Sequence, residues 1–226
     1  MRSEWDGWTR VGRYGVEATF RAGFRMRFAG LEHIPTAGGA LLTYNHVSVL
    51  DPLMVALGAA KRGRPVRFLV LTDDYERSVV GWTFRRTRQI PIKRGLGDWT
   101  AIEQVADVLR GGRLAGMAPE GTVGHGSEIQ AGKRGAARIA LAAGVPVVPV
   151  GIWGTNDRWG KQGPSWELKR PAAATVFGPP IVARGTPRSI PDTAAMTERI
   201  MAGIAEVAEQ AREAAALVSP PRRAVR

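Results

Sequence analysis

His46 and Asp51 are the residues whose types and spacing first suggest chemistry; they lie five positions apart in N-H-V-S-V-L-D-P, residues 45–52. On a regular helix this spacing would put them about 140° apart, so they can meet only across a turn. A turn is expected, because the strand ending near Tyr44 must bend into a helix that Pro52 can open. An imidazole held by a carboxylate is a general-base pair. The alternative is a His–Asp hydrogen bond that only holds the turn, and the spacing alone does not separate the two.

A second group of polar residues follows an apolar run and reads Ala-Pro-Glu-Gly-Thr at residues 118–122. Gly121 allows a ligand to approach the backbone closely, and Thr122 can donate or accept a hydrogen bond. The alternative is an ordinary turn between a strand and a loop. This segment and the His46 segment together are the candidates for a site.

Four segments of the sequence, in order, resemble the conserved blocks of the glycerolipid acyltransferases, the family of 1-acylglycerol-3-phosphate acyltransferase. Residues 45–51 resemble its N-H-x4-D block, and residues 118–122 resemble its F-P-E-G-T block. Between them, I-P-I-K-R at residues 90–94 is similar to a block that ends in a basic residue, and V-P-V-V-P-V at residues 145–150 is similar to an apolar fourth block. Each block alone is a weak signal, and four in the correct order are a strong one.

The resemblance implies transfer of an acyl group from a thioester, on acyl-CoA or acyl carrier protein, to the free hydroxyl of 1-acyl-glycerol 3-phosphate. His46 would take the hydroxyl proton and Asp51 would orient His46. No enzyme nucleophile and no cofactor beyond the co-substrate are implied, which agrees with the absence of Cys and of a G-x-S-x-G elbow. Asn45 would hold the turn or polarise a ligand, with a local backbone hydrogen bond as the alternative.

The substrate phosphate requires cations or backbone N–H groups. The resemblance implies Arg94, with the adjacent Lys93 as its alternative, and the pair Glu120-Gly121. Position 123 is Val where the family has Arg, so one expected phosphate ligand is missing. Either Lys133 and the following arginine replace it, or the acceptor is a different lysolipid. The candidate substrate-binding residues are therefore Asn45, Lys93, Arg94, Glu120, Gly121, Thr122 and Lys133.

The other two histidines carry weaker hypotheses. His125 stands between glycines and is either a second site residue or a plain loop histidine, whereas His33 is expected to be structural. Three scattered histidines and no Cys argue against a metal site.

Short apolar runs alternate with helix-like segments, which predicts an α/β fold: a mixed, largely parallel sheet covered by helices. The strands are expected at residues 40–44, 66–71, 89–92, 114–118, 147–152 and 174–182. The helices are expected at residues 52–60, 99–109, 133–143 and 192–217, the last docked by an apolar stripe of Ile200, Ile204, Val207 and Ala211. We divide the chain into a helical segment (1–30), an acyltransferase domain (31–218) and a basic tail (219–226).

The segment at residues 5–28 mixes Trp and Phe with five arginines at imperfect helical spacing and is expected to form an amphipathic helix. Such a helix can lie on anionic lipid with Trp5 and Trp8 at headgroup level, or it can simply cover the core. No unbroken apolar run approaches the roughly 18–20 residues of a membrane span. With no secretory signal recognisable either, a peripheral location on the cytoplasmic side of the inner membrane is predicted.

The chain of 226 residues has globular proportions of apolar and charged residues, and its net charge is +12. This charge favours anionic lipid, an acidic acyl carrier protein or nucleic acid, although an arginine-rich genome alone can produce it. Nucleic acid is not expected as a partner, because no basic helix, finger or aromatic sheet motif is found. The rival to an acyltransferase is a non-catalytic lipid- or nucleic-acid-binding protein of the same fold.

Overall fold

A computed structural model of the 226-residue chain describes residues 7–76, 78–93, 99–124, 128–165 and 170–219. Its centre is a seven-stranded sheet in the order β1-β8-β6-β2-β5-β3-β4. All neighbouring strands are parallel except β6 and β8. The strands are β1 (Arg25–Ala29), β2 (Ala40–Tyr44), β3 (Val66–Leu71), β4 (Ile90–Ile92), β5 (Leu114–Met117), β6 (Val147–Trp153) and β8 (Ala172–Phe177), and a short β7 (Gly163–Pro164) lies outside the sheet. The predicted α/β class is confirmed.

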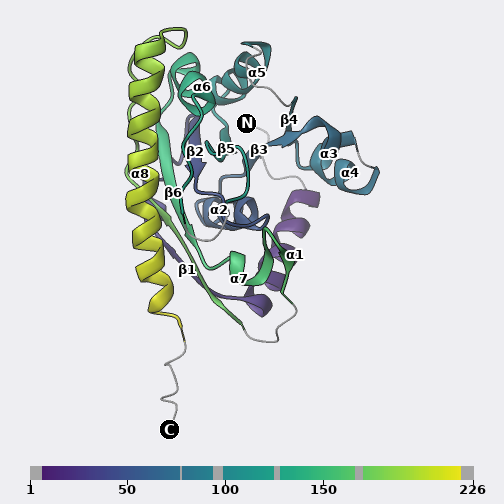
Figure 1. The fold of residues 1–226 in the computed structure, drawn as a ribbon. Coiled ribbons are helices and arrows are strands. Elements are labelled where there is room, and N and C mark those ends of the chain that lie inside the picture. Colours follow the sequence, from purple (N-terminus) through teal and green to yellow (C-terminus); the bar gives the residue numbers. More distant parts are fainter. Residues whose placement is uncertain (1–6, 77, 94–98, 125–127, 166–169, 220–226) are drawn as a thin grey trace.

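Helices cover both faces of the sheet (Figure 1). Successive strand residues point to opposite faces, so Leu41 packs under the helices of one side and Leu42 under those of the other. The first side holds α5 (Trp99–Arg110), α6 (Gly135–Ala143) and α8 (Ile190–Ala216), and the second holds α2 (Asp51–Lys61). Four short or peripheral helices complete the fold: α1 (Gly7–Gly23), α3 (Thr72–Glu76), α4 (Ser78–Arg86) and α7 (Asn156–Trp159). A single 3-10 turn, η1 (Leu31–His33), precedes β2.

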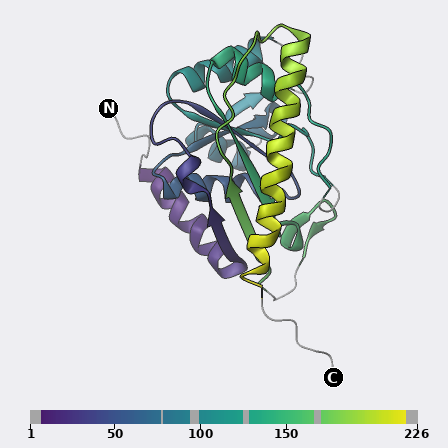
Figure 2. The same ribbon diagram turned by 90° about the vertical axis from the view of Figure 1, so that its left-hand side faces the viewer.

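The C-terminal helix α8 lies directly on the sheet, as Figure 2 shows. A Cβ on Gly151 of β6 would come within 2.0 Å of the carbonyl oxygen of Val207, so only glycine permits this approach. The predicted stripe from Ile200 to Ala211 is buried. Ser189 caps the helix by accepting a hydrogen bond from the backbone N–H of Asp192, which explains a start two residues before the predicted one.

The predicted helix over residues 5–28 is wrong at its end. Helix α1 stops at Gly23, and β1 follows and pairs with β8. Residues 25–28 alternate charged and apolar side chains, which is the period of a strand. Phe20 and Phe24 anchor the segment by packing against the buried face of α2. The division of the chain at residues 30 and 218 stays a prediction.

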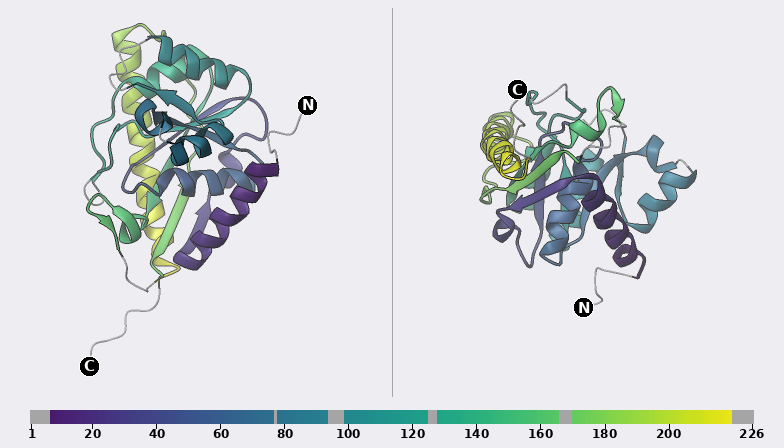
Figure 3. Two further views of the ribbon diagram at one scale, coloured as in Figure 1. Left: turned by 90° about the vertical axis from the view of Figure 1, so that its right-hand side faces the viewer. Right: turned by 90° about the horizontal axis from the view of Figure 1, so that it is seen from below.

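The strand predicted at residues 174–182 begins and ends earlier, at Ala172 and Phe177. Gly178 is followed by two prolines, which have no N–H for a ladder. Helices α3 and α4, between β3 and β4, were not predicted; Figure 3 shows them projecting from the body of the molecule. None of the helices in the described ranges combines the length and apolarity that crossing a bilayer requires.

Candidate active site

The predicted turn between His46 and Asp51 is present and brings the two side chains together. His46 follows β2, and Asp51 is the first residue of α2 with Pro52 next to it. The His46 Nδ1 lies 3.0 Å from Oδ2 of Asp51. The Asp51 carboxylate accepts here, so Nδ1 carries the proton and Nε2 is left as an acceptor. The His46 side chain is 19% exposed and that of Asp51 is fully buried.

Asp51 is held by more than His46. Its Oδ2 also accepts hydrogen bonds from the backbone N–H groups of Val47 and Ser48, both at 2.7 Å. Its Oδ1 accepts a bond from the hydroxyl of Thr155 at 2.6 Å. These bonds fix a buried carboxylate in one orientation, and that orientation aims the His46 ring.

Thr155 was missed by sequence reasoning. It is fully buried just beyond the end of β6, next to β2 in the sheet. The available signal was a small polar residue directly after an apolar strand, in the segment Trp153-Gly154-Thr155. Without the strand order, nothing in the sequence relates it to Asp51, which lies 104 positions away.

Asn45 does not reach the cavity beside His46. Its amide donates to the carbonyl of Ile152 at 2.9 Å and accepts from the N–H of the same residue at 2.8 Å. The side chain is only 2% exposed. The backbone hydrogen bonds of Asn45 are therefore not local, as the predicted alternative had them, but join the end of β2 to β6.

Glu120 is buried next to His46 and contacts its backbone. Its Oε1 accepts the backbone N–H of His46 at 2.8 Å, and its Oε2 accepts the N–H of Gln130 at 3.0 Å. Burial raises the pKa of the Glu120 carboxyl, and the two N–H donors act against that rise. The residue is 3% exposed and is not part of the cavity lining. The contact of Glu120 with substrate phosphate stays a prediction; in the structure the carboxylate holds the His46 backbone.

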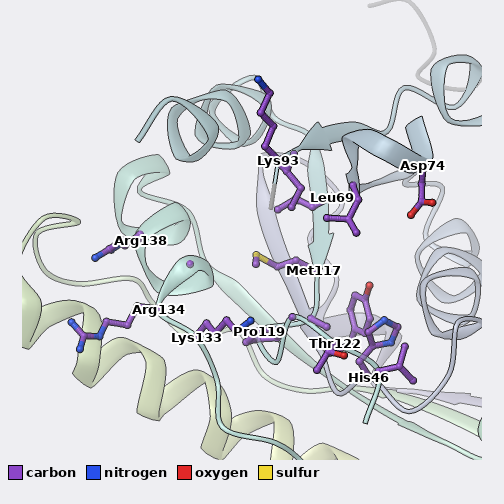
Figure 4. A pocket seen from close by; sticks show the side chains of 17 residues that line it. His46, Leu69, Asp74, Lys93, Met117, Pro119, Thr122, Lys133, Arg134 and Arg138 are labelled. Carbon is purple, nitrogen blue, oxygen red and sulfur yellow. The ribbon is translucent and has the colours of Figure 1, made fainter. Parts of the chain in front are cut away.

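A cavity of about 900 Å³ opens at the carboxyl ends of the parallel strands, with His46 in its wall (Figure 4). This is the position at which open α/β sheets bind ligands. Apolar side chains from β3, β4 and β5 line part of it: Leu69, Leu71, Ile92 and Met117. The ring of the buried Tyr44 stands edge-on to His46, with centroids 5.8 Å apart. The cavity thus offers an apolar surface next to an imidazole.

Four cations also line the cavity: Lys93, Lys133, Arg134 and Arg138. Within the part of the chain that the structure describes, none of the four forms an ion pair. One carboxylate, Asp74, faces the same space from α3. The lining is therefore strongly positive and suits an anionic ligand.

Lys133 is the cation nearest the Glu-Gly-Thr turn. Gly121 has φ of +71°, and a Cβ there would lie 2.9 Å from the Lys133 Nζ. Glycine at this position thus lets the ammonium approach the backbone of the turn. The backbone N–H of Lys133 donates to the carbonyl of Pro119 at 2.9 Å, which fastens the start of α6 to the same turn.

The remaining predicted residues are distributed as follows. Thr122 is exposed and lines the cavity, as does Val123. Lys93 also lines the cavity, but its ammonium points away from His46 in Figure 4. Arg94 and His125 lie outside the described residues. His33 is structural as predicted, since its Nδ1 lies 2.8 Å from the carbonyl oxygen of Phe177.

The geometry supports removal of a proton at the mouth of a cationic cavity. In this arrangement His46 Nε2 can accept a proton, and Asp51 can stabilise the resulting imidazolium. Lys133, Gly121 and Thr122 offer an ammonium, a glycine backbone and a hydroxyl for an anionic group nearby.

Comparisons with known proteins identify a family that the chain matches. A family model described as Acyltransferase matches residues 25–153. A 1-acyl-sn-glycerol-3-phosphate acyltransferase of Borreliella burgdorferi is 28% identical over 145 residues, which cover 60% of this chain and 54% of that protein. An uncharacterized protein of Mycobacterium leprae is 30% identical over 151 residues, which cover 61% of this chain and 39% of that protein. The chain thus spans about half or less of the length of these relatives.

A solved structure shares the fold. The crystal structure of the 1-acyl-sn-glycerophosphate (LPA) acyltransferase PlsC from Thermotoga maritima superposes with a TM-score of 0.66 at 21% identity. The superposition covers 91% of this chain and 85% of that one, so it extends beyond the residues matched by the family model.

Proposed function

Because this chain belongs to the acyltransferase family, we propose that it transfers a fatty acyl group from a thioester donor to the free hydroxyl of 1-acyl-glycerol 3-phosphate, giving phosphatidic acid. The observation that carries the proposal is the His46–Asp51 pair in the wall of a cationic cavity. The names of several relatives support the choice of acceptor.

The reaction follows from the orientation of His46. Nε2 removes the proton of the acceptor hydroxyl as that oxygen attacks the thioester carbonyl carbon. The new C–O bond forms a tetrahedral oxyanion, whose collapse breaks the C–S bond. The leaving thiolate takes the proton back from the imidazolium, so no proton is gained or lost. Asp51 favours the charged imidazolium throughout, because its carboxylate stays at Nδ1.

Lys133 is the proposed ligand of the acceptor phosphate, with Gly121 and Thr122 beside it. Their place between the His46 loop and α6 supports this role. Lys93 is proposed as a more distant contact, since its ammonium points away from the imidazole. No cofactor is required: the acyl-CoA or acyl carrier protein is a co-substrate.

A different lysolipid acceptor is the second candidate, and Val123 motivates it. This half-buried side chain lines the cavity where the family pattern has Arg. An apolar residue there supplies no charge to bind a doubly charged phosphate monoester. It suits an acceptor with a phosphodiester or a larger headgroup.

We further propose that the protein works as a peripheral enzyme on the cytoplasmic face of the membrane. Its exposed apolar side chains and its net charge of +12 support binding to anionic lipid. Nucleic acid is not among the proposed partners.

The proposal is tested by transfer of labelled acyl chains from acyl-CoA and acyl carrier protein to a panel of lysolipids. Substitution of His46 by Ala should lower turnover roughly 100-fold or more, the usual contribution of a positioned general base. Circular dichroism should show an unchanged fold, because His46 is partly exposed. His33→Ala is the matched control, since the His33 ring lies against the backbone carbonyl of Phe177 and does not line the cavity.

Two results would contradict the proposal. Full turnover of the His46 variant would show that His46 is not the general base. Product from another lysolipid but none from lysophosphatidate would reject the acceptor in favour of the second candidate.

A further inference from the structure

The four cations of the cavity do not lie together. In Figure 4, Lys133 lies between His46 and Arg134, and both arginines lie at the end of the cavity farthest from the imidazole. An acceptor whose hydroxyl reaches His46 therefore meets Lys133 first. Arg134 and Arg138 are left for a different anionic group.

Arg134 and Arg138 form a pair with its own geometry. Arg134 is the residue that precedes α6, and Arg138 lies one turn farther along, so their side chains project from one face. Like charges at this spacing repel each other unless an anion lies between them. Both arginines lack an ion-pair partner among the described residues, and both line the cavity. Two guanidinium groups present planar forks of N–H donors that match phosphate oxygens.

We propose that Arg134 and Arg138 form a second anion subsite, which binds the phosphate of the thioester donor. The inference rests on the proposed function and assigns two positions at increasing distance from His46: the acceptor phosphate at Lys133 and the donor phosphate at the two arginines. The thioester carbonyl then lies at His46, beyond Lys133, and the arm that joins it to the donor phosphate passes the apolar strip around Met117. The shared chemistry of the donors is the phosphate ester of a pantetheine arm, present in both acyl-CoA and acyl carrier protein.

The position of α6 adds to the subsite. Its first turn presents unpaired backbone N–H groups and the positive end of the helix dipole toward the residues that precede it. Gly135 of this turn lines the cavity and carries no side chain that would keep a phosphate away.

Binding of coenzyme A alone tests the subsite without catalysis. Isothermal titration calorimetry should give roughly 10- to 100-fold weaker binding for the Arg134→Gln/Arg138→Gln double variant than for the wild type, as expected for lost charge-assisted bonds. Saturating glycerol 3-phosphate should not displace coenzyme A, because the subsites are separate. The control is Arg62→Gln/Arg212→Gln, which removes the same charge from exposed positions outside the cavity.

Kinetics with two donors identifies the contacted group. The double variant should have a raised KM for acyl-CoA, an unchanged KM for the lysolipid and, with phosphate-free acyl-pantetheine, the same KM as the wild type. Lys133→Gln should show the reverse pattern, with only the acceptor KM raised. Kinetics with acyl carrier protein as donor shows whether the arginines contact the single pantetheine phosphate or the nucleotide phosphates, which only coenzyme A carries.

The inference is overturned if the wild type and the double variant bind coenzyme A equally, or if the wild type does not bind it. It is also overturned if the double variant raises KM for acyl-pantetheine as much as it raises KM for acyl-CoA. A raised KM for the lysolipid would assign the arginines to the acceptor instead. Failure of the proposed function is a different result: no acyl transfer to any lysolipid by the wild type. Coenzyme A binding that depends on the two arginines would support the subsite even then.

Discussion

Asp51 is a fully buried carboxylate that accepts four hydrogen bonds, from His46, Val47, Ser48 and Thr155. The first three partners come from its own turn, whereas Thr155 comes from the segment that follows β6. Thr155 therefore ties the catalytic turn to β6. It touches neither cavity nor substrate and acts through Asp51, as a positioning residue.

Thr155→Val should lower kcat by roughly 10-fold while KM stays within about 2-fold, a size typical of partners that orient a site residue. The variant leaves the buried Oδ1 of Asp51 without the hydrogen bond from the Thr155 hydroxyl. Asp51 then holds the His46 ring less firmly in one orientation. Steady-state kinetics over a range of pH measures the effect. Thr155→Ser should restore activity, because it keeps the hydroxyl.

Thr175→Val is the matched control for this substitution. Thr175 is equally buried, and its hydroxyl has no hydrogen-bond partner among the described residues. It should cost nothing in kcat. Equal losses in the Thr155 and Thr175 variants would mean that packing, rather than the hydrogen bond to Asp51, explains the result.

The residues of the site differ in how far the sequence could predict them. The His46–Asp51 contact was predictable, because the whole turn and the proline that opens α2 lie within a few residues. The direction of the Glu120 side chain was not. Its carboxylate turns inward to the N–H groups of His46 and Gln130, and those partners come from two separate loops.

At the scale of elements, α1 and α4 each expose apolar side chains. Val11 and Tyr14 of α1 are 68% and 64% exposed, and Val79 and Trp82 of α4 are 78% and 49% exposed. Both helices lie on the side of the molecule away from α8 (Figures 1 and 3). Exposed apolar side chains among arginines are the pattern of a surface that docks on anionic lipid.

Val79→Ser/Trp82→Ala should weaken binding to vesicles that contain anionic phospholipid, by roughly 10-fold or more given the apolar area removed. Vesicle sedimentation at several salt concentrations measures it, and salt should weaken binding of both proteins. Val182→Ser is the control, since Val182 is 54% exposed but lies beside α8, where its carbonyl accepts a bond from Arg199. Unchanged vesicle binding by the α4 variant would show that α4 does not contact the membrane.

The same helix shows why some elements escaped prediction. Helix α4 is short, and its Val79, Val80 and Trp82 are exposed, so it lacks the buried apolar stripe that marks a helix. What fixes it is contact with α3: a Cβ on Gly81 would come within 2.0 Å of the Tyr75 carbonyl oxygen. The well-predicted helices α5 and α8 carry buried stripes instead.

At the scale of the whole molecule, the cavity occupies the carboxyl ends of the strands and Arg64 secures the opposite ends. Arg64 is 7% exposed, and its guanidinium donates to the carbonyls of Pro35, Gly38 and Gly112 at 2.7–2.8 Å. These residues precede β2 and β5, and Arg64 itself precedes β3. One side chain thus joins the starts of three neighbouring strands.

Arg64→Lys should lower the free energy of unfolding by about 2–4 kcal/mol, because an ammonium cannot match the planar fork and leaves buried carbonyls without donors. Urea denaturation measures it. The neighbouring exposed Arg62→Lys should stay within about 0.5 kcal/mol of the wild type. Equal stability of the two variants would mean that water replaces the lost donors.

The sheet as a whole was predictable in content but not in order. Six apolar runs predict six of the strands, but the sequence of β1 predicts a helix, because charged residues interrupt its short alternating pattern. Which strands are neighbours depends on pairing between distant residues, and no local signal encodes it. The position of Thr155 beside Asp51 follows from that order.

The pairing of β1 with β8 has a consequence for biosynthesis. In the sheet, β1 has no neighbour other than β8, whose residues 172–177 are translated long after it. On the ribosome, β1 therefore has no strand to pair with until β8 has emerged, so the helix before it is not held by the sheet during most of synthesis. Closure of this long loop is the slow, late event that we expect in folding, and lipid nearby would meet this helix first.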